Sequence, residues 1–251
     1  MVKLLTRSSL MLLGIAATAS VMAAQSSNTT PSITSVSKIT TAEHQTITIT
    51  GSGFGTHAAY TGNSDYISLY DETKKWEAGF EPDDDTVTLI VNSWTNTKIT
   101  LGGFAGAWGT DGYTLAVGNK EQITLWNAQG SGGGFGIACD GDCARKTVTI
   151  VAADSSIELR SSPNPSVYGE PVTLTAVVTS GDGAPPDGGK VLFMKGTEVL
   201  GSGTLRGGVA RFTTSALDFG DNSIKAVYAG SSDFAATGRD EESARVTHTV
   251  N

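Results

Sequence analysis

The residue types that most often perform catalysis are few in this chain, and they form no catalytic set. The three histidines, His44, His57 and His248, lie far apart in the sequence, and no serine sits in a Gly-x-Ser-x-Gly turn beside them. His248 falls at the end of a predicted last strand, where an exposed or edge histidine is ordinary. Neither cysteine resembles an activated nucleophile. The sequence therefore predicts no catalytic residues and no enzyme.

Paired carboxylates are the other catalytic possibility, because glycoside hydrolysis needs two carboxyl groups facing each other across a cleft. The acidic residues that such a pair could use are Asp71, Glu72, Glu77, Asp83, Asp84 and Asp85. A single small β-sandwich seldom leaves a deep cleft, and such acidic runs are usually solvated loops. A small carbohydrate-active enzyme is therefore the least favoured function.

The two cysteines, Cys139 and Cys143, enclose the sequence Asp-Gly-Asp. Three intervening residues with a central glycine can close a small loop, and export would permit its oxidation. Zinc needs about four ligands, and the histidines are distant in sequence. The spacing thus favours a local disulfide between Cys139 and Cys143 and predicts no metal site there.

Calcium is the one cofactor that the acidic loops leave open. The candidate ligands are Asp83, Asp84, Asp85, Asp140 and Asp142. Loop carboxylates and backbone carbonyls suit calcium, and extracellular modules bind it weakly. Neither loop has EF-hand spacing, so plain acidic loops without any cofactor are the favoured interpretation.

Aromatic residues in loops are the best candidates for binding. Sugars stack their C–H faces on Trp and Tyr, and β-sandwiches often present such surfaces. The candidates are Tyr60, Tyr66, Tyr70, Trp76, Trp94 and Trp108. A sandwich core also needs large aromatic residues, and Trp126, within a strand, is expected there. The segment 56–80 is where an exposed aromatic patch is first expected, with a polysaccharide or an extracellular protein as partner.

The charge of the chain argues against nucleic-acid binding. The formal net charge is -8, and lysine and arginine are scattered rather than clustered. An acidic surface repels phosphate backbones, so no nucleic-acid partner is expected.

The N-terminus has the pattern of a signal peptide. Lys3 and Arg7 precede an apolar stretch over 10–19, and small residues at 21–24 suit signal-peptidase cleavage. We predict a signal peptide at 1–24 and a disordered leader at 25–31. No second apolar stretch of about 18 residues follows, so no stable membrane insertion of the mature chain is expected. The protein is predicted to be exported, with secretion, the cell surface and the periplasm left open.

The elements that must position these residues are short strands. Strict alternation at 46–50 places Ile47 and Ile49 on one face, and glycines at 51–55 allow a sharp corner. Further strands are expected over 32–37, 66–70, 86–91, 98–101, 113–117, 122–127 and 146–151. The pattern restarts after 152 with seven strands over about 97 residues, typical of an immunoglobulin-like sandwich. The predicted fold is all-β: two tandem immunoglobulin-like β-sandwiches, at 32–152 and 156–250.

The second half resembles a bacterial Ig-like repeat over nearly all of 156–250. The residues that carry the resemblance are 161–172 (SSPNPSVYGEPV), 190–193 (KVLF), 212–217 (FTTSAL) and 222–234 (NSIKAVYAGSSDF). The resemblance implies a non-catalytic spacer or adhesion module.

The first half resembles IPT/TIG domains, an immunoglobulin-like family. The residues that carry this resemblance are 33–36 (ITSV), 45–55 (QTITITGSGFG) and 94–99 (WTNTKI). The stretch 55–79 is longer than that family usually allows, and the glycine-rich run 130–136 with the cysteine loop also looks like an addition.

Together these features predict a non-catalytic exported interaction or adhesion module. The first sandwich is expected to bind a ligand, and the second to act as a spacer. The alternative from another class is a structural component of the cell envelope or matrix that assembles through strand edges.

Overall fold

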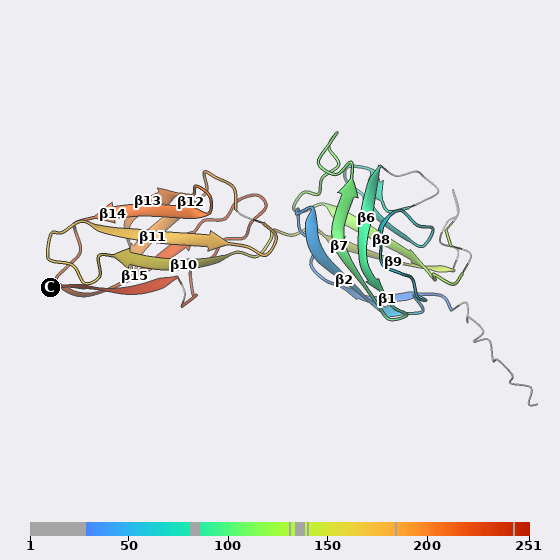
Figure 1. Ribbon diagram of the computed structural model, residues 1–251, viewed down its shortest axis with the longest axis horizontal. Helices are drawn as coiled ribbons and strands as arrows, with labels where there is room; N and C mark the ends of the chain where they lie inside the picture. The colour runs from blue at the N-terminus through green and yellow to red at the C-terminus, as the bar shows by residue number, and fades with distance from the viewer. Residues whose placement is uncertain are drawn as a thin grey trace, which may run out of the picture.

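The chain forms two tandem immunoglobulin-like β-sandwiches in a computed structural model that describes residues 29–80, 86–130, 132–133, 139, 141–183, 185–242 and 244–251 (Figure 1). The predicted all-β fold is confirmed, since these residues form strands and turns and no helix. Accordingly, no helix in the described ranges is long and apolar enough to cross a membrane. The expected signal peptide at 1–24 lies outside the described residues, as does most of the leader at 25–31.

The first sandwich is built from one curled sheet. Its strands are β1 (Ser32–Val36), β2 (His44–Ser52), β3 (Tyr60–Gly62), β4 (Ile67–Asp71), β5 (Trp76–Ala78), β6 (Val87–Trp94), β7 (Lys98–Gly106), β8 (Lys120–Trp126) and β9 (Cys143–Thr149). The order across the sheet is β1-β2-β7-β6-β5-β4-β8-β9, and β3 pairs with β6. The two end strands, β1 and β9, lie close together, so the sheet folds back on itself and encloses a core.

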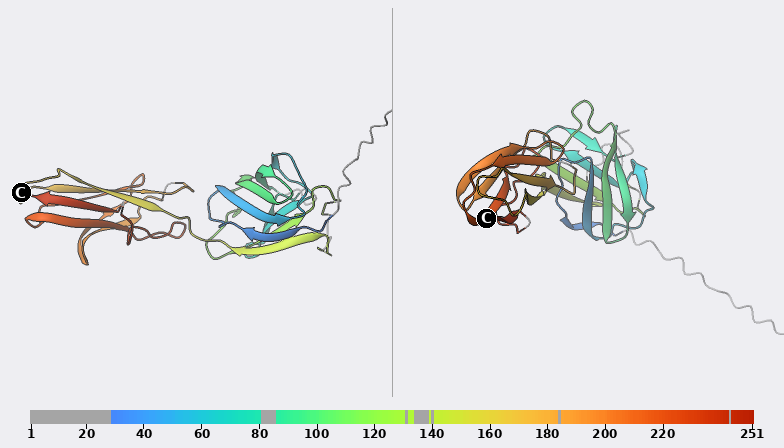
Figure 2. Two further views of the ribbon diagram at one scale, coloured as in Figure 1. Left: turned by 90° about the horizontal axis from the view of Figure 1, so that it is seen from below. Right: turned by 60° about the vertical axis from the view of Figure 1, so that its left-hand side comes forward.

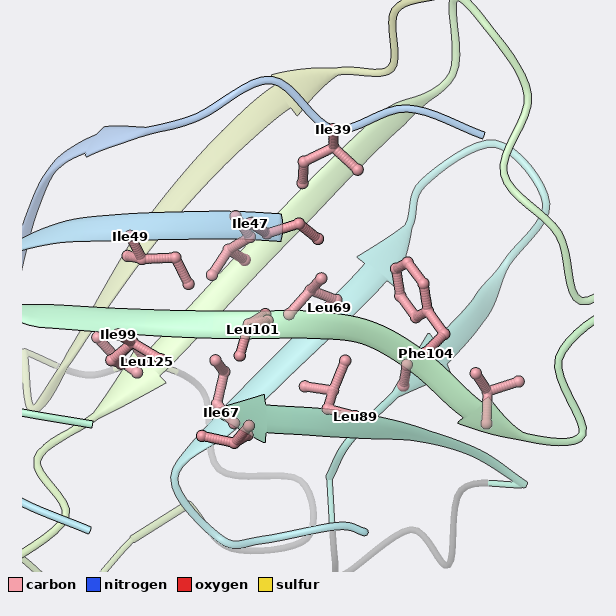
Figure 3. Close-up of a cluster of buried hydrophobic side chains, with 14 of the residues drawn as sticks. Ile39, Ile47, Ile49, Ile67, Leu69, Leu89, Ile99, Leu101, Phe104 and Leu125 are labelled. Atoms are coloured by element: carbon pink, nitrogen blue, oxygen red, sulfur yellow. The ribbon is translucent and has the colours of Figure 1, made fainter. Parts of the chain in front are cut away.

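Alternating side chains fill that core. Ile47 and Ile49 of β2 are buried as their spacing predicts, opposite Leu101 and Ile99 of β7. Figure 3 shows aliphatic side chains from β2, β4, β6, β7 and β8 turned toward one another in this core. Burial of these side chains is the main source of stability for the sandwich.

The segment 56–80 is part of the sheet rather than an appendage to it. It supplies β3, β4 and β5, of which the sequence predicted only β4. Ala78 of β5 pairs in parallel with Val87 of β6, while β5 also pairs antiparallel with β4. This short strand therefore joins the two halves of the curled sheet.

The strand expected at 113–117 is absent, which corrects the sequence prediction. Instead, the Tyr113 amide donates to the Thr110 carbonyl (2.8 Å) and the Gly109 amide to the Tyr113 carbonyl (2.9 Å). Gly109, Asp111 and Gly112 all adopt positive φ, which favours such a tight turn over an extended strand. Tyr113 is thereby turned toward the sandwich.

The second sandwich has the seven predicted strands. They are β10 (Ser156–Ser162), β11 (Val172–Thr179), β12 (Lys190–Lys195), β13 (Glu198–Thr204), β14 (Val209–Thr214), β15 (Gly220–Tyr228) and β16 (Arg245–Val250). One sheet has the order β10-β11-β14 and the other β13-β12-β15-β16. Alternate residues along β11, β12 and β15 are buried in its core: Val172, Leu174, Ala176, Val178, Val191, Phe193, Ile224, Ala226 and Tyr228.

The two sandwiches lie end to end, joined by a short connection around Ala153 (Figures 1 and 2). The Ala153 amide donates to the Asp233 carbonyl (2.8 Å), and the Ala235 amide donates to the Ala153 carbonyl (2.9 Å). Lys38 and Asp154 form an exposed ion pair at 2.8 Å. A few hydrogen bonds and this ion pair therefore order the junction, and the buried cores of the two sandwiches form separate clusters.

Candidate functional site

The six candidate aromatic residues do not form one exposed surface. One group gathers around His57, whose ring lies 4.9 Å from Tyr60, 6.1 Å from Tyr66 and 5.8 Å from Trp94, measured between ring centroids. Trp94 is only 4% exposed, and its Nε1 donates to the Phe54 carbonyl at 3.0 Å. Trp94 therefore belongs to the core.

Tyr60 and Tyr66 pack partly against the same core. The Tyr60 hydroxyl is 2.8 Å from Ser64 Oγ, and burial raises the pKa of that hydroxyl. A ring whose face packs on the core and whose hydroxyl is already paired offers little area to a ligand. This first group thus anchors the segment 56–66 to the sandwich.

The second group lies around Trp76 at the end of the first sandwich nearer the junction. Phe104 and Trp108 stack with centroids 4.3 Å apart, and Trp76 lies edge-on to Trp108 at 5.9 Å and to Tyr113 at 6.2 Å. Trp76 is 7% exposed, whereas Trp108 and Tyr113 are half-buried. Aromatic pairs at these separations are mutually stabilising, so the group is rigid.

A pocket of about 290 Å³ opens beside this second group. Its lining consists of Tyr70, Lys75, Trp76, Glu77, Thr86 and Tyr113. Three of these residues are among the sequence candidates: Tyr70 and Trp76 as binding aromatics, and Glu77 as a possible catalytic carboxylate. Tyr113 was missed because 113–117 was expected to be a strand, and the turn that replaces it directs the ring into the pocket.

The β4–β5 turn fixes one wall of this pocket. The buried Asp71 carboxylate accepts hydrogen bonds from the Thr73 amide (2.7 Å), the Lys74 amide (2.8 Å) and Asn119 Nδ2 (2.8 Å). Lys75 then adopts φ = 62°, an uncommon conformation for a side chain of its size. Its Nζ lies 5.8 Å from the centroid of the Tyr70 ring. The turn therefore places a cation against an aromatic face at the pocket.

A buried carboxyl group lies next to the same turn. Glu121 of β8 is the cross-strand neighbour of Asp71, is fully buried, and has no hydrogen-bond partner for either carboxyl oxygen among the described residues. Desolvation first, and then the negative charges of Asp71, Glu77 and Glu72, raise the pKa of Glu121 to about 9. Glu121 is therefore protonated at neutral pH. Its alternation with Ile123 and Leu125 was the available signal for its burial.

The predicted disulfide between Cys139 and Cys143 is confirmed, with the two Cα atoms 5.3 Å apart. Cys143 packs with Phe80 and Trp126, whose rings stack 5.2 Å apart. Trp126 is buried, as expected of a core residue.

The metal-ligand candidates are less well placed. Asp142 lies near the two cysteines, and among the described residues only these three bring potential ligand atoms within 4.8 Å of one another. Because the sulfurs are joined in a disulfide, Asp142 alone offers an anionic ligand there. The calcium candidates Asp83, Asp84, Asp85 and Asp140 lie outside the described residues, so that hypothesis stays a prediction.

Comparison with known proteins bears on the second sandwich. Residues 159–251 match the sequence model of the family described as bacterial Ig-like domain (group 3). The resemblance predicted for the second half is thereby confirmed. The IPT/TIG resemblance of the first half stays a prediction. No curated protein matches the chain in sequence.

Several solved structures are similar over most of the chain. Fibronectin(III)-like modules of Clostridium thermocellum CbhA share 16% identity over 87% of this chain and 90% of theirs, with a TM-score of 0.26. The Yersinia pseudotuberculosis adhesin InvE shares 14% identity over 89% of this chain and 59% of its own, with a TM-score of 0.29. The Escherichia coli adhesin FdeC shares 16% identity over 90% of this chain and 65% of its own, with a TM-score of 0.31.

Proposed function

We propose that this protein is an exported, non-catalytic interaction module that binds a carbohydrate in the aromatic pocket of its first sandwich. The observation that carries the proposal is the pocket lined by the half-buried rings of Tyr70 and Tyr113 and the edge of the buried Trp76, together with Lys75, Glu77 and Thr86. The second sandwich, matched by a bacterial Ig-like family, acts as a spacer. The predicted signal peptide supports a location outside the cytoplasm.

The lining suits a sugar because it combines aromatic and polar groups. Aromatic rings bury the C–H faces of a sugar, while a few well-placed polar side chains fix its orientation. Lys75 donates hydrogen bonds, Glu77 accepts them, and Thr86 does both. The contacts of Trp76 with Trp108 and Tyr113 hold the rings in place before a ligand arrives, which reduces the entropy lost on binding.

The same geometry favours binding over hydrolysis. Among the described lining residues, Glu77 is the one carboxylate. Glu121 is protonated but fully buried, so its carboxyl group cannot touch a substrate in the pocket. A glycoside hydrolase needs two carboxyl groups that reach the scissile bond from either side.

The test is retention of the mature protein on insoluble polysaccharides: peptidoglycan sacculi, chitin, cellulose and xylan. We expect retention on at least one of them, and a loss of about tenfold in affinity for Tyr113→Ala, a partly exposed lining residue. Tyr168→Ala, an exposed tyrosine of the second sandwich, is the matched control and should bind like the parent protein. Absence of retention on all four, or equal retention by Tyr113→Ala, would refute the proposal.

A further inference from the structure

The end of the second sandwich farthest from the first carries the most exposed apolar side chains of the described residues. Phe219 is 76% exposed, Tyr168 68% and Val167 66%. We call these three residues the distal tip.

Strand pairing places the three side chains together. Val250 at the end of β16 pairs with Gly220 on one side and bridges to Ser166 on the other. Neighbouring strands lie about 4.8 Å apart, so Ser166 and Gly220 are about 10 Å apart across β16. Phe219 precedes Gly220, and Val167 and Tyr168 follow Ser166. All three therefore lie beyond the same strand end, which Figure 1 shows at the marked C-terminal end of the chain.

The loop that presents Val167 and Tyr168 is tied to β16. Asn164 Nδ2 donates to the Thr247 carbonyl (2.9 Å), and Asn164 Oδ1 accepts from the Thr249 amide (3.1 Å). The Ser166 amide donates to the Thr249 carbonyl (3.0 Å), and the Tyr168 amide donates to the Asn251 carbonyl (3.1 Å). The two apolar side chains are thus held in the solvent by an ordered backbone.

The loop that presents Phe219 is also fixed. Leu217 is buried in the core of the second sandwich, and the Asp218 carbonyl accepts from Asn222 Nδ2 at 2.8 Å. The Asp218 carboxylate forms an ion pair with Lys195. Rigid, exposed aromatic side chains lose little entropy when a partner covers them, which is the property of an interface anchor.

The charges around the distal tip determine what can cover it. Glu170 and Asp221 are exposed there without a cationic partner among the described residues, whereas the exposed Asp218 is neutralised by its ion pair with Lys195. Such an acidic surround repels anionic polymers and anionic membranes. It also opposes the approach of a second copy tip to tip. An apolar centre with a charged rim is the usual anatomy of a protein–protein interface.

We propose that the distal tip is a second docking surface, which binds a protein face carrying apolar side chains ringed by lysine or arginine. Opposite charge speeds the encounter and orients the partner, and the apolar side chains supply most of the affinity. This surface is separate from the aromatic pocket. The pocket lies in the first sandwich, whereas the distal tip lies at the end of the second sandwich farthest from the first. The protein would then contact two partners, a carbohydrate and a basic protein, at separate places.

The probe is a fluorescent synthetic amphipathic helix with leucine on one face and lysine on the other, titrated with the full mature chain. We expect saturable binding that weakens about tenfold or more in Phe219→Ser and in Tyr168→Ser. Val117→Ser removes an apolar side chain that is 45% exposed on the first sandwich, and this matched control should bind like the parent protein. A peptide with glutamate in place of lysine should not bind.

Three results would overturn the inference: no binding of the lysine peptide, equal binding by the tip variants, or equal binding of the glutamate peptide. Thermal unfolding of each variant checks that the fold is retained, as expected for exposed positions. If the tip variants instead lose retention on polysaccharides while peptide binding is unchanged, the distal tip binds sugar and the protein-docking proposal fails. The pocket variant Tyr113→Ala should leave peptide binding unchanged, which separates the two proposals.

Discussion

At the scale of single residues, Glu121 lowers the stability of the first sandwich at neutral pH. The unfolded chain ionises this carboxyl group near pH 4.5, whereas the folded protein holds it protonated up to about pH 9. The unfolded state therefore releases a proton that the folded state keeps. This difference favours the unfolded state by about 3 kcal/mol at pH 7. It vanishes below pH 4.5 and grows as the pH rises toward 9.

The corresponding prediction concerns Glu121→Gln, which removes the ionisable group and nearly keeps its shape. The variant should be more stable than the parent protein at pH 7, by about 3 kcal/mol, and the difference should shrink toward pH 5. Urea unfolding at several pH values, followed by tryptophan fluorescence, measures this. Glu43→Gln, at an exposed position, serves as the control and should leave the pH dependence unchanged. Parallel pH profiles for Glu121→Gln and the parent protein would contradict the prediction.

At the scale of elements, alternation predicted strands well, and turn chemistry was the weaker guide. The Thr-Ile-Thr-Ile-Thr run lies within β2, as predicted, because strict alternation of apolar and polar residues indicates a strand with one buried face. The strand prediction for 113–117 was wrong, because positive φ at Asp111 and Gly112 closes a local turn there and no strand forms. The short strands β3 and β5 carry too few residues for a period to be visible.

The candidate site likewise contains residues that the sequence predicted and residues that it did not. Tyr70 and Trp76 were predicted as binding residues from residue type alone, because large aromatic side chains in or near loops are suited to stacking on a sugar. The position of Tyr113 depends on the turn at 109–113, and that of Glu121 depends on the pairing of β8 with the distant strand β4. No local pattern records those contacts, and a single sequence therefore places only part of the pocket.

A prediction at this scale concerns the loop at 163–170. His248 of β16 is buried, rather than exposed as an edge histidine often is, and its Nε2 lies 2.9 Å from Ser166 Oγ. Burial lowers the pKa of His248, so the unfolded state takes up a proton before the folded state does. Stability is therefore complete above about pH 6.5 and is lost as the pH falls below that value.

The amides of Ser166 and Tyr168 should then exchange with solvent markedly faster at pH 5 than at pH 7, after correction for the intrinsic effect of pH. His248→Gln should remove this extra acceleration, because glutamine carries no ionisable group. Hydrogen exchange followed by mass spectrometry measures the effect on these residues. If the variant keeps the same acid-induced acceleration, His248 is not its cause.

At the scale of the whole molecule, the sandwiches have separate cores and a polar junction. The exposed Lys38–Asp154 pair contributes little to their association, because water and salt screen it. The hydrogen bonds of Ala153 order the connection, while the buried apolar residues of the two sandwiches form separate clusters. Two such sandwiches are expected to unfold independently.

Calorimetry of the full chain should therefore resolve two transitions. All four tryptophans lie in the first sandwich, so tryptophan fluorescence should follow only one of them. Ile123→Val and Ile224→Val remove one buried methylene from the first and second cores, respectively, at a cost of about 1 kcal/mol each. Each should lower only its own transition, by about 4–8 °C, with the fluorescence transition moving only for Ile123→Val. A common shift of both transitions by either variant would mean that the junction couples the sandwiches and that the second stabilises the first.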